Sequence, residues 1–473
     1  MRTFKLFING EWVSGTETEI KSPFSEKTIG KVHKADEAMV DKAIAAGKKA
    51  EKAMAALSAH ERKEILRGIV SGLQDRHQEM ADIICDEAGK PMQYAKGETS
   101  RAIQTFQFAI ESVTHMAQKS VDLDAVPTGE GRFGILRRFP IGLVSAVSPF
   151  NFPLNLVAHK IAPAIATGCP VVLKPASQTP MAALLLAEIC DKAGLPKGGL
   201  NVVPCHRDAA DAFTVDPRFQ LLSFTGSPGV GWKMKDRVEK KKIVLELGGN
   251  AAVIVHSDAD LEKVVPRVAV GAFAYAGQVC ISVQRIIVHK AVYKKFCDML
   301  VKEVENLGVG DPTKEDVVCG PLIDSKNAER IVDWIEEAKE KGARVLIGGQ
   351  REGNVVSPAL LENVSKDTKL GCEEAFGPVA TLSSYDDIDD AIAQNNNSDF
   401  GLQAGVYTDS MENLWKCYEQ LEVGGVIHND VPTFRVDNMP YGGIKDSGFG
   451  REGLPYAFED YTEQRLLAIR SKY

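Results

Sequence analysis

The sequence predicts an α/β protein with two doubly wound α/β domains and a small additional β element. The first observation is the length of the chain. A chain of 473 residues is longer than those that normally fold around a single hydrophobic core, so two or three domains are expected. The second is that strand patterns alternate with helical patterns from residue 141 onward, which is typical of parallel sheets covered on both faces. The third is that the segments 120–138 and 461–469 have strand character but fit neither series.

The N-terminal part is expected to hold a hairpin followed by helices. Lys5–Val13 alternates apolar residues around Asn9-Gly10, the strongest short turn signal. Pro91 interrupts the helical pattern that follows. Apolar residues at helical spacing on either side of it predict helices over 36–57, 61–85 and 98–116.

Two α/β series follow. The first has predicted strands at 141–147, 170–174, 200–203, 221–224 and 243–247, with helices at 154–167, 181–193 and 230–238. The second has predicted strands at 251–255, 285–288 and 344–347, with helices at 261–275, 293–307 and 327–341, and it continues to about Ile427. We expect the first series to form a dinucleotide-binding domain from 1–119 and 139–248, and the second to form a catalytic domain over 249–455.

Composition argues against several classes of protein. The formal net charge of −8 argues against nucleic acid or an anionic membrane as the main partner. The nine cysteines contain no CxxC pair and no zinc-like spacing with histidine, so we expect no metal site and a reducing compartment. The N-terminus lacks a signal-peptide core, and apolar stretches such as Met181–Ile189 fall short of the ~20 residues of a membrane span. A cytoplasmic protein is therefore expected.

Two short segments carry the chemistry. Phe273–Cys280 places one thiol behind a Gly-Gln pair, and Leu245–Asn250 places one carboxylate in an apolar strand that ends in Gly-Gly. A thiol nucleophile and a separate carboxylate base are what a covalent thioester mechanism needs. Glu246 could also be an edge-strand acid that faces water, but in an apolar site its pKa would rise and make it a usable base.

These segments resemble the aldehyde dehydrogenase superfamily, and the resemblance covers nearly the whole chain. It implies that Cys280 attacks the aldehyde carbon, that hydride leaves for a nicotinamide, and that a thioester remains. It also implies that Glu246 activates the water that hydrolyses this thioester. The side chain of Asn151 and the backbone N–H of Cys280 would form the oxyanion hole. Taken alone, Asn151 would be read as an Asx-turn residue.

The resemblance implies NAD or NADP as the cofactor. The residues expected to bind it are Pro149, Lys174, Ser177, Gly226, Ser227, Gly248, Glu374 and Phe376. The glycine-rich segment at Gly226 opens a helix whose free N–H groups suit a pyrophosphate, although many strand–helix turns look alike. Lys174 would hold the adenosine ribose, Glu374 the nicotinamide ribose, and Phe376 would pack near the nicotinamide. NAD-preferring members often carry Glu where this chain has Ser177. The neutral Ser177 hydroxyl does not repel the 2′-phosphate of NADP, so either cofactor is expected to bind.

The substrate pocket is expected to include Arg101, Phe150, His159, Ile281 and Arg435. Basic residues gather at comparable places in family members that oxidise aldehydes with an anionic tail, although each could instead be structural. Val279 stands where some phosphate-handling members carry Arg, which argues against glyceraldehyde 3-phosphate. The segment around Cys280 resembles lactaldehyde and phosphonoacetaldehyde dehydrogenases. The expected reaction is therefore irreversible oxidation of lactaldehyde, sulfolactaldehyde, phosphonoacetaldehyde or a short semialdehyde.

Two other functions stay open. A CoA-acylating semialdehyde dehydrogenase is disfavoured by Glu246, which that branch typically lacks. A non-catalytic relative is disfavoured because such proteins usually lose the nucleophile, whereas Cys280 is present. In the resembled family, segments matching 120–138 and 456–473 form a small sheet that joins subunits, so a homodimer or homotetramer is expected. Its last strand would be an exposed edge in a monomer.

Overall fold

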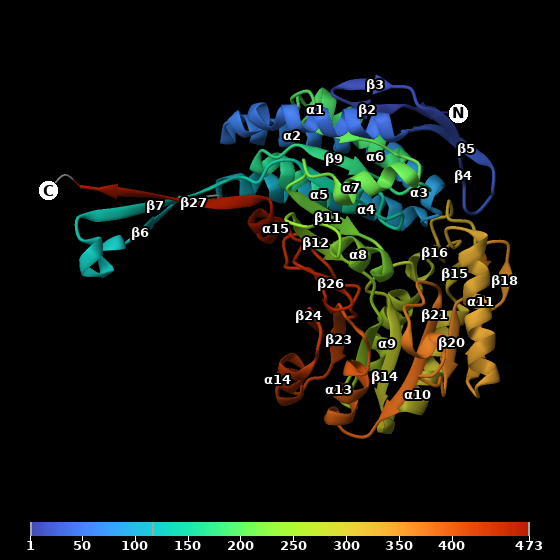
Figure 1. Cartoon of the computed structure of the whole chain (residues 1–473). Coiled ribbons are helices and arrows are strands. Elements are labelled where there is room, and N and C mark those ends of the chain that lie inside the picture. Colours follow the sequence, from blue (N-terminus) through green and yellow to red (C-terminus); the bar gives the residue numbers. More distant parts are fainter. Residues whose placement is uncertain (1, 116–117, 472–473) are drawn as a thin grey trace.

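The computed structural model describes residues 2–115 and 118–471 and contains two helix-covered sheets with a projecting β arm (Figure 1). The predicted α/β class with two doubly wound parallel sheets is confirmed. The predicted domain boundaries stay a prediction. Met116, the last residue of one predicted helix, lies outside the described residues.

The first sheet has the order β26-β12-β11-β8-β9-β10-β2-β3, and its five central strands are parallel. Its strands are β2 (Leu6–Ile8), β3 (Glu11–Val13), β8 (Val144–Val147), β9 (Val171–Lys174), β10 (Leu200–Val202), β11 (Leu221–Thr225), β12 (Lys242–Glu246) and β26 (Gly448–Phe449). Its helices are α1 (Glu37–Ala56), α2 (Ala59–Asp75), α3 (His77–Ala88), α4 (Met92–Ser112), α5 (Asn155–Thr167), α6 (Met181–Lys192), α7 (Ala212–Val215), α8 (Pro228–Lys235) and α15 (Leu454–Asp460).

Both faces of this sheet are buried. Val171 and Leu173 of β9 join a core built with α2 to α6, whereas Val172 between them joins the opposite core with α1. Alternate residues of one strand thus enter different cores, which explains why the strand is continuously apolar.

The second sheet has the order β17-β20-β21-β14-β13-β23-β24 and is parallel except for β17. Its strands are β13 (Ala251–Val255), β14 (Val283–His289), β17 (Arg344–Ile347), β20 (Ala359–Glu362), β21 (Val379–Tyr385), β23 (Gln403–Tyr407) and β24 (Gly425–His428). Its helices are α9 (Leu261–Phe273), α10 (Lys290–Glu305), α11 (Ser325–Glu340), α12 (Lys369–Cys372), α13 (Ile388–Asn396) and α14 (Met411–Gln420). Only 247–250 separate the last residue of β12 from the first of β13, so the two sheets meet there.

Three local predictions are wrong. The helix predicted over 61–85 is two helices, because the backbone turns at Arg76, whose side chain pairs with Glu79 and Glu188. Helix α4 begins directly after Pro91 and not at residue 98, since proline is tolerated at a helix start. The segment 120–138 is not one strand: β6 (Lys119–Val121) and β7 (Arg132–Pro140) are separated by two 3₁₀ turns.

The hairpin at Asn9-Gly10 forms as predicted, with β2 and β3 paired at one edge of the first sheet. Further strands lie outside both large sheets. An N-terminal three-stranded sheet, which the sequence did not reveal, contains β1 (Arg2–Phe4), β4 (Thr16–Lys21) and β5 (Thr28–Lys34). Smaller paired strands are β15 (Gly308–Val309), β16 (Val317–Cys319), β18 (Arg351–Glu352), β19 (Val355–Val356), β22 (Phe400–Gly401) and β25 (Ile444–Lys445).

The arm is a three-stranded sheet in the order β27-β7-β6 that projects from the body (Figure 1). β27 (Thr462–Arg470) pairs with β7 along its whole length, from Thr462 opposite Pro140 to Arg470 opposite Arg132. In the described part of the chain, every helix is too short or too polar to cross a membrane.

Candidate active site

One cavity, of about 440 Å³, lies at the carboxyl ends of β8, β9, β11 and β12. This edge of a parallel sheet is the usual ligand site of doubly wound folds. The structure brings most of the predicted residues to its wall: Pro149, Phe150, Asn151, Lys174, Gly226, Ser227, Glu246, Gly248, Cys280, Glu374 and Phe376. Ser177 is exposed and follows the lining residue Ala176 by one position.

A strained loop holds Cys280. The residues Tyr275, Ala276 and Gly277 all have positive φ, at 53°, 53° and 66°. Such backbone costs about 1–3 kcal/mol per non-glycine residue and persists only where the surroundings enforce it. Gln278 enforces it, because its side chain donates to the carbonyls of Tyr275 and Pro321 and accepts from the N–H of Ile323. The position of Cys280 is thereby fixed from outside the loop.

The Cys280 thiol contacts Tyr441. Its Sγ lies 2.9 Å from the Tyr441 Oη. Burial raises the pKa of Cys280 to about 12, although Tyr441 and the nearby Arg435 oppose this shift. The sulfur is therefore a thiol at rest and needs help to become a nucleophile.

Glu246 is a buried carboxyl without a partner. Its side chain is 3% exposed, and neither oxygen has a hydrogen-bond partner among the described residues. Burial raises its pKa well above the usual range, and the neighbouring Glu452 adds to the shift. β12 lies between β11 and β26, so Glu246 is not an edge-strand acid that faces water. A carboxyl with a raised pKa is suited to act as a base near neutral pH.

Asn151 lies beside the Cys280 loop. Its Nδ2 donates to the backbone carbonyl of Gln278 at 3.0 Å, and its side chain is buried. The amide is therefore anchored to Gln278, which precedes Cys280 by two positions in the chain. Asn151 and Cys280 line the same cavity. Because an amide N–H donates to a developing oxyanion, this placement is compatible with the predicted role.

The loop at Gly248 fits tightly against Glu374. A Cβ on Gly248 would lie 2.2 Å from a Glu374 carboxylate oxygen, and the N–H of Gly249 donates to that carboxylate at 2.9 Å. Burial raises the pKa of Glu374 to about 7. Phe376 packs edge-to-face on Phe150, with ring centroids 5.8 Å apart. Burial also lowers the pKa of Lys174 at the end of β9.

An ion network behind the cavity was missed by sequence reasoning. Lys160 Nζ contacts the hydroxyls of Ser223 and Thr225 at 3.0 and 2.7 Å, and Glu452 Oε1 at 3.4 Å. The other oxygen of Glu452 accepts from Arg435 at 3.1 Å. Lysine within the entirely buried helix α5 is the one sequence signal that would have exposed this network, since a fully buried lysine needs compensation.

Asp437, also missed, holds two of the predicted substrate residues. It forms a two-point contact with Arg101, at 2.6 and 3.2 Å, and lies 2.8 Å from His159 Nε2. Its contacts with His159 and Arg101 hold the pKa of Asp437 well below its usual range despite its burial. Arg101 and His159 are therefore turned to Asp437 and are not among the residues that line the cavity.

Arg435 and Ile281 both pack against Tyr441, the residue whose hydroxyl contacts the Cys280 sulfur. The Arg435 guanidinium lies 3.6 Å from the centre of the Tyr441 ring, and Ile281 packs with Tyr441 and Leu402.

Burial and the charge of Arg435 lower the pKa of His159, which leaves it neutral. The three cations Arg101, Lys160 and Arg435 pair with two anions, Asp437 and Glu452. This cluster therefore has a net positive charge.

The aldehyde dehydrogenase family model matches residues 12–467. The chain belongs to the aldehyde dehydrogenase family. It is 41% identical to a 3-sulfolactaldehyde dehydrogenase from Priestia aryabhattai, over 99% of this chain and 98% of that protein. An aldehyde dehydrogenase from Physcomitrella patens, solved in complex with the reaction product succinate, matches with a TM-score of 0.98 at 43% identity, over 100% of this chain and 99% of that one. A glyceraldehyde-3-phosphate dehydrogenase from Methanocaldococcus jannaschii, complexed with NADP, matches with a TM-score of 0.92 at 37% identity, over 96% and 99%.

These matches confirm the predicted family and the predicted class of enzyme. The expectation of NAD or NADP agrees with the NADP complex of the archaeal neighbour. The role of each site residue in this chain stays a prediction.

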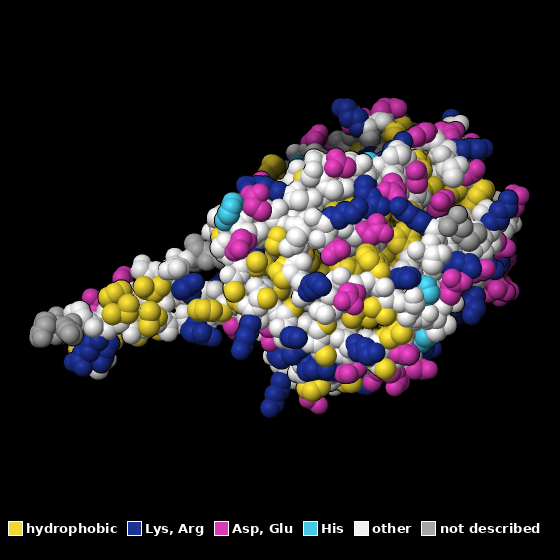
Figure 2. Space-filling model, turned by 90° about the horizontal axis from the view of Figure 1, so that it is seen from above, with side chains coloured by type: hydrophobic (Ala, Val, Ile, Leu, Met, Phe, Trp, Pro, Cys, Tyr) yellow, Lys and Arg dark blue, Asp and Glu magenta, His cyan; other side chains and the backbone are white. Residues whose placement is uncertain are grey.

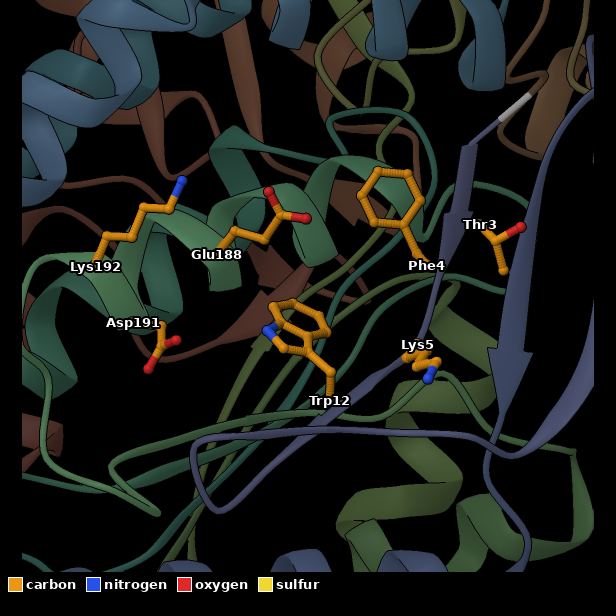
Figure 3. A pocket seen from close by; sticks show the side chains of 7 residues that line it. All are labelled: Thr3, Phe4, Lys5, Trp12, Glu188, Asp191 and Lys192. Carbon is orange, nitrogen blue, oxygen red and sulfur yellow. The ribbon is translucent and has the colours of Figure 1, made fainter.

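A second hollow lies at the N-terminal edge of the first sheet (Figure 3). Its walls are Thr3, Phe4, Lys5, Trp12, Glu188, Asp191 and Lys192, and it shares no lining residue with the Cys280 cavity. It contains no thiol, and Glu188 is already paired with Arg76. We therefore assign the chemistry to the Cys280 cavity.

The substitution Gly249→Ala tests how closely the loop positions Cys280. A Cβ there would lie 2.3 Å from the Cys280 carbonyl oxygen, so the backbone of one of the two must move. A displacement of about 1 Å costs about 100-fold in rate, so activity with a short aldehyde should fall by about that factor. Gly97→Ala is the control, because nothing lies within 4 Å of its Cβ. Equal activity of both variants would contradict the assignment.

Proposed function

We propose that this chain oxidises a short aldehyde with an anionic tail to its carboxylate, with NAD or NADP as the oxidant. The observation that carries the proposal is that the Cys280 thiol, the unpartnered Glu246 carboxyl and the Asn151 amide line one cavity. Nucleophile, base and oxyanion donor are the groups that this oxidation needs.

The first step is attack by Cys280. Its sulfur adds to the aldehyde carbon and forms a thiohemiacetal. The Asn151 amide and the Cys280 N–H stabilise the oxyanion, and loss of one such donor typically costs ~3 kcal/mol of transition-state stabilisation. Burial of the site strengthens these interactions, because less water competes with the donors.

The walls of the cavity fit a dinucleotide. The segment at Gly226 joins the end of β11 to the start of α8, where free backbone N–H groups favour phosphate. Gly248 leaves room for the Glu374 carboxylate, which a side chain at 248 would displace. Lys174, Glu374 and Phe376 would hold the two riboses and the nicotinamide, in the roles given by the resemblance. When bound, the nicotinamide supplies the acceptor for the hydride.

Glu246 completes the reaction. Its carboxylate takes a proton from a water molecule, and that water hydrolyses the thioester on Cys280. A CoA-acylating enzyme would instead pass the acyl group to a thiol, and the buried carboxyl opposes that alternative.

The substrate class follows from charge. The cluster of Arg101, Lys160 and Arg435 exceeds its two carboxylates by one positive charge, which favours an anion although the chain is negative overall. Similarity to a 3-sulfolactaldehyde dehydrogenase and to an enzyme solved with succinate supports the same class. A neutral aldehyde such as lactaldehyde is the second candidate, since Asp437 already engages Arg101 and His159.

A panel of short aldehydes tests this function. Initial rates with NAD and with NADP would be measured for neutral, carboxylated, sulfonated and phosphonated members, with Cys280→Ala as the blank. We expect higher rates with an anionic member. The ratio of the rates with NAD and with NADP would show whether Ser177, in place of Glu, allows NADP to be used. Arg101→Met removes one cation and should raise KM for the anionic member about tenfold, or about 1.4 kcal/mol, with little change for a neutral one.

The control for this panel is Arg267→Met, because Arg267 also pairs with an aspartate, but that aspartate is Asp430, which is not one of the two carboxylates of the cluster. Better turnover of long-chain or aromatic aldehydes by the unmodified enzyme would contradict the proposal. An equal change in KM for the anionic aldehyde in Arg101→Met and Arg267→Met would also contradict the proposal.

We also propose that the arm joins two copies of this chain. β27 is the outer strand of the arm, so its outer edge is unpaired there. Leu466 and Leu467 are 48% and 58% exposed, and Phe133 on β7 is 47% exposed. Figure 2 shows apolar and basic side chains together on the arm. An exposed apolar strand edge of this length is a liability in a monomer and a ready site for pairing.

Light scattering after size-exclusion chromatography tests the arm. We expect a dimer or tetramer, and Leu467→Asp should shift the chain to a smaller species because a charge would be buried in the contact. Val215→Asp is the control, since Val215 is also exposed but lies on α7. A monomer at micromolar concentration would refute the proposal.

A further inference from the structure

The hydroxyl of Tyr441 is the one side-chain hydrogen-bond partner of the Cys280 sulfur within the described residues, at 2.9 Å. In the uncharged pair either group can donate. Once the thiol has lost its proton, only the tyrosine can donate, because a thiolate is an acceptor alone. The contact therefore favours the ionised form of the nucleophile over the neutral one.

The fold fixes the Tyr441 ring on three sides. Its backbone N–H and C=O bond to the C=O and N–H of Glu452, at 3.0 and 2.7 Å. The Arg435 guanidinium covers one face of the ring at 3.6 Å, and Ile281 packs against the side chain. The ring is 3% exposed. The hydroxyl is thus aimed at the sulfur by contacts that do not involve Cys280.

We propose that Tyr441 is a catalytic residue that donates a hydrogen bond to the Cys280 thiolate and so raises the fraction of ionised nucleophile. This rests on the proposed function of Cys280. The phenol keeps its proton throughout, because burial and the nearby Glu246 disfavour a phenolate. The thiol proton goes to a base, either Glu246 or a buffer molecule. The electron pair left on the sulfur then forms the bond to the carbon that is attacked, and Tyr441 releases the sulfur as that bond forms.

Alkylation by iodoacetamide tests the proposal without aldehyde or cofactor. The thiolate displaces iodide, so the rate reports the ionised fraction of Cys280, with Cys280→Ala as the blank. Below the pKa of the thiol, this rate rises about tenfold per pH unit. Tyr441→Phe removes only the hydroxyl, and it should reach a given rate about one pH unit higher, which means about tenfold slower alkylation at neutral pH.

Tyr385→Phe is the matched control. Tyr385 is a buried tyrosine on β21 whose hydroxyl has no partner in the described residues, so its removal should leave the alkylation profile unchanged. Identical profiles for Tyr441→Phe and the unmodified enzyme, or equal shifts for Tyr441→Phe and Tyr385→Phe, would overturn the proposal. A lower plateau rate above the pKa of the thiol, with the midpoint of the profile unchanged, would make Tyr441 merely structural, which also overturns the proposal.

A second test covers the case in which Tyr441→Phe does not fold. Biosynthetic replacement of tyrosine by 3-fluorotyrosine makes the phenol a stronger donor, so alkylation should become faster at neutral pH. An unchanged rate would contradict the proposal. Failure of the aldehyde panel together with a displaced alkylation profile would refute the proposed function and leave the thiolate contact intact.

Discussion

Burial of the Glu246 carboxyl and the Cys280 thiol in the walls of one cavity is the constraint on which the site depends. Both groups are charged in the form that does chemistry, and burial disfavours both charged forms. The fold creates this situation at the four residues that join β12 to β13, where the two sheets come together. The same burial that raises the pKa of each group also leaves less water to compete with the hydrogen-bond donors of the site.

Compensation for that burial comes from a cluster of ions behind the cavity. Glu452 links Lys160 to Arg435, and these cations lower its pKa to about 2. Arg435 then reaches the Tyr441 ring, whose hydroxyl touches the sulfur. A continuous series of contacts therefore connects Lys160, in the fully buried helix α5, to the Cys280 sulfur. Removal of one member of such a buried pair typically costs about 3–5 kcal/mol, because the other is left uncompensated.

The sequence predicted the two α/β series because their strands are buried on both faces and so appear as continuous apolar runs, as in Ala251–Val255. The N-terminal strand β4 escaped detection because Thr16–Lys21 is polar and is stabilised by pairing, not by its own pattern. The break at Arg76 escaped because helical periodicity continues across a one-residue turn. Cys280, Glu246 and Asn151 were found because each sits in a short motif that resembles a known family.

Asp437, Glu452 and Tyr441 could not be found in this way. Their partners lie up to about 340 residues away in the chain, as for Asp437 and Arg101, so no local spacing relates them. Only the return of the chain to the first sheet at β26 places these residues beside the cavity.

The proposed reaction depends on Glu246, which activates the water that releases the product from Cys280. The most direct test mixes Glu246→Gln with aldehyde and NAD or NADP and follows both cofactor reduction and the mass of the Cys280 peptide. We expect up to one equivalent of reduced cofactor, an acyl adduct on Cys280, and turnover at least about 100-fold slower than that of the unmodified enzyme. Steady turnover at the unmodified rate, with no adduct on Cys280, would contradict it.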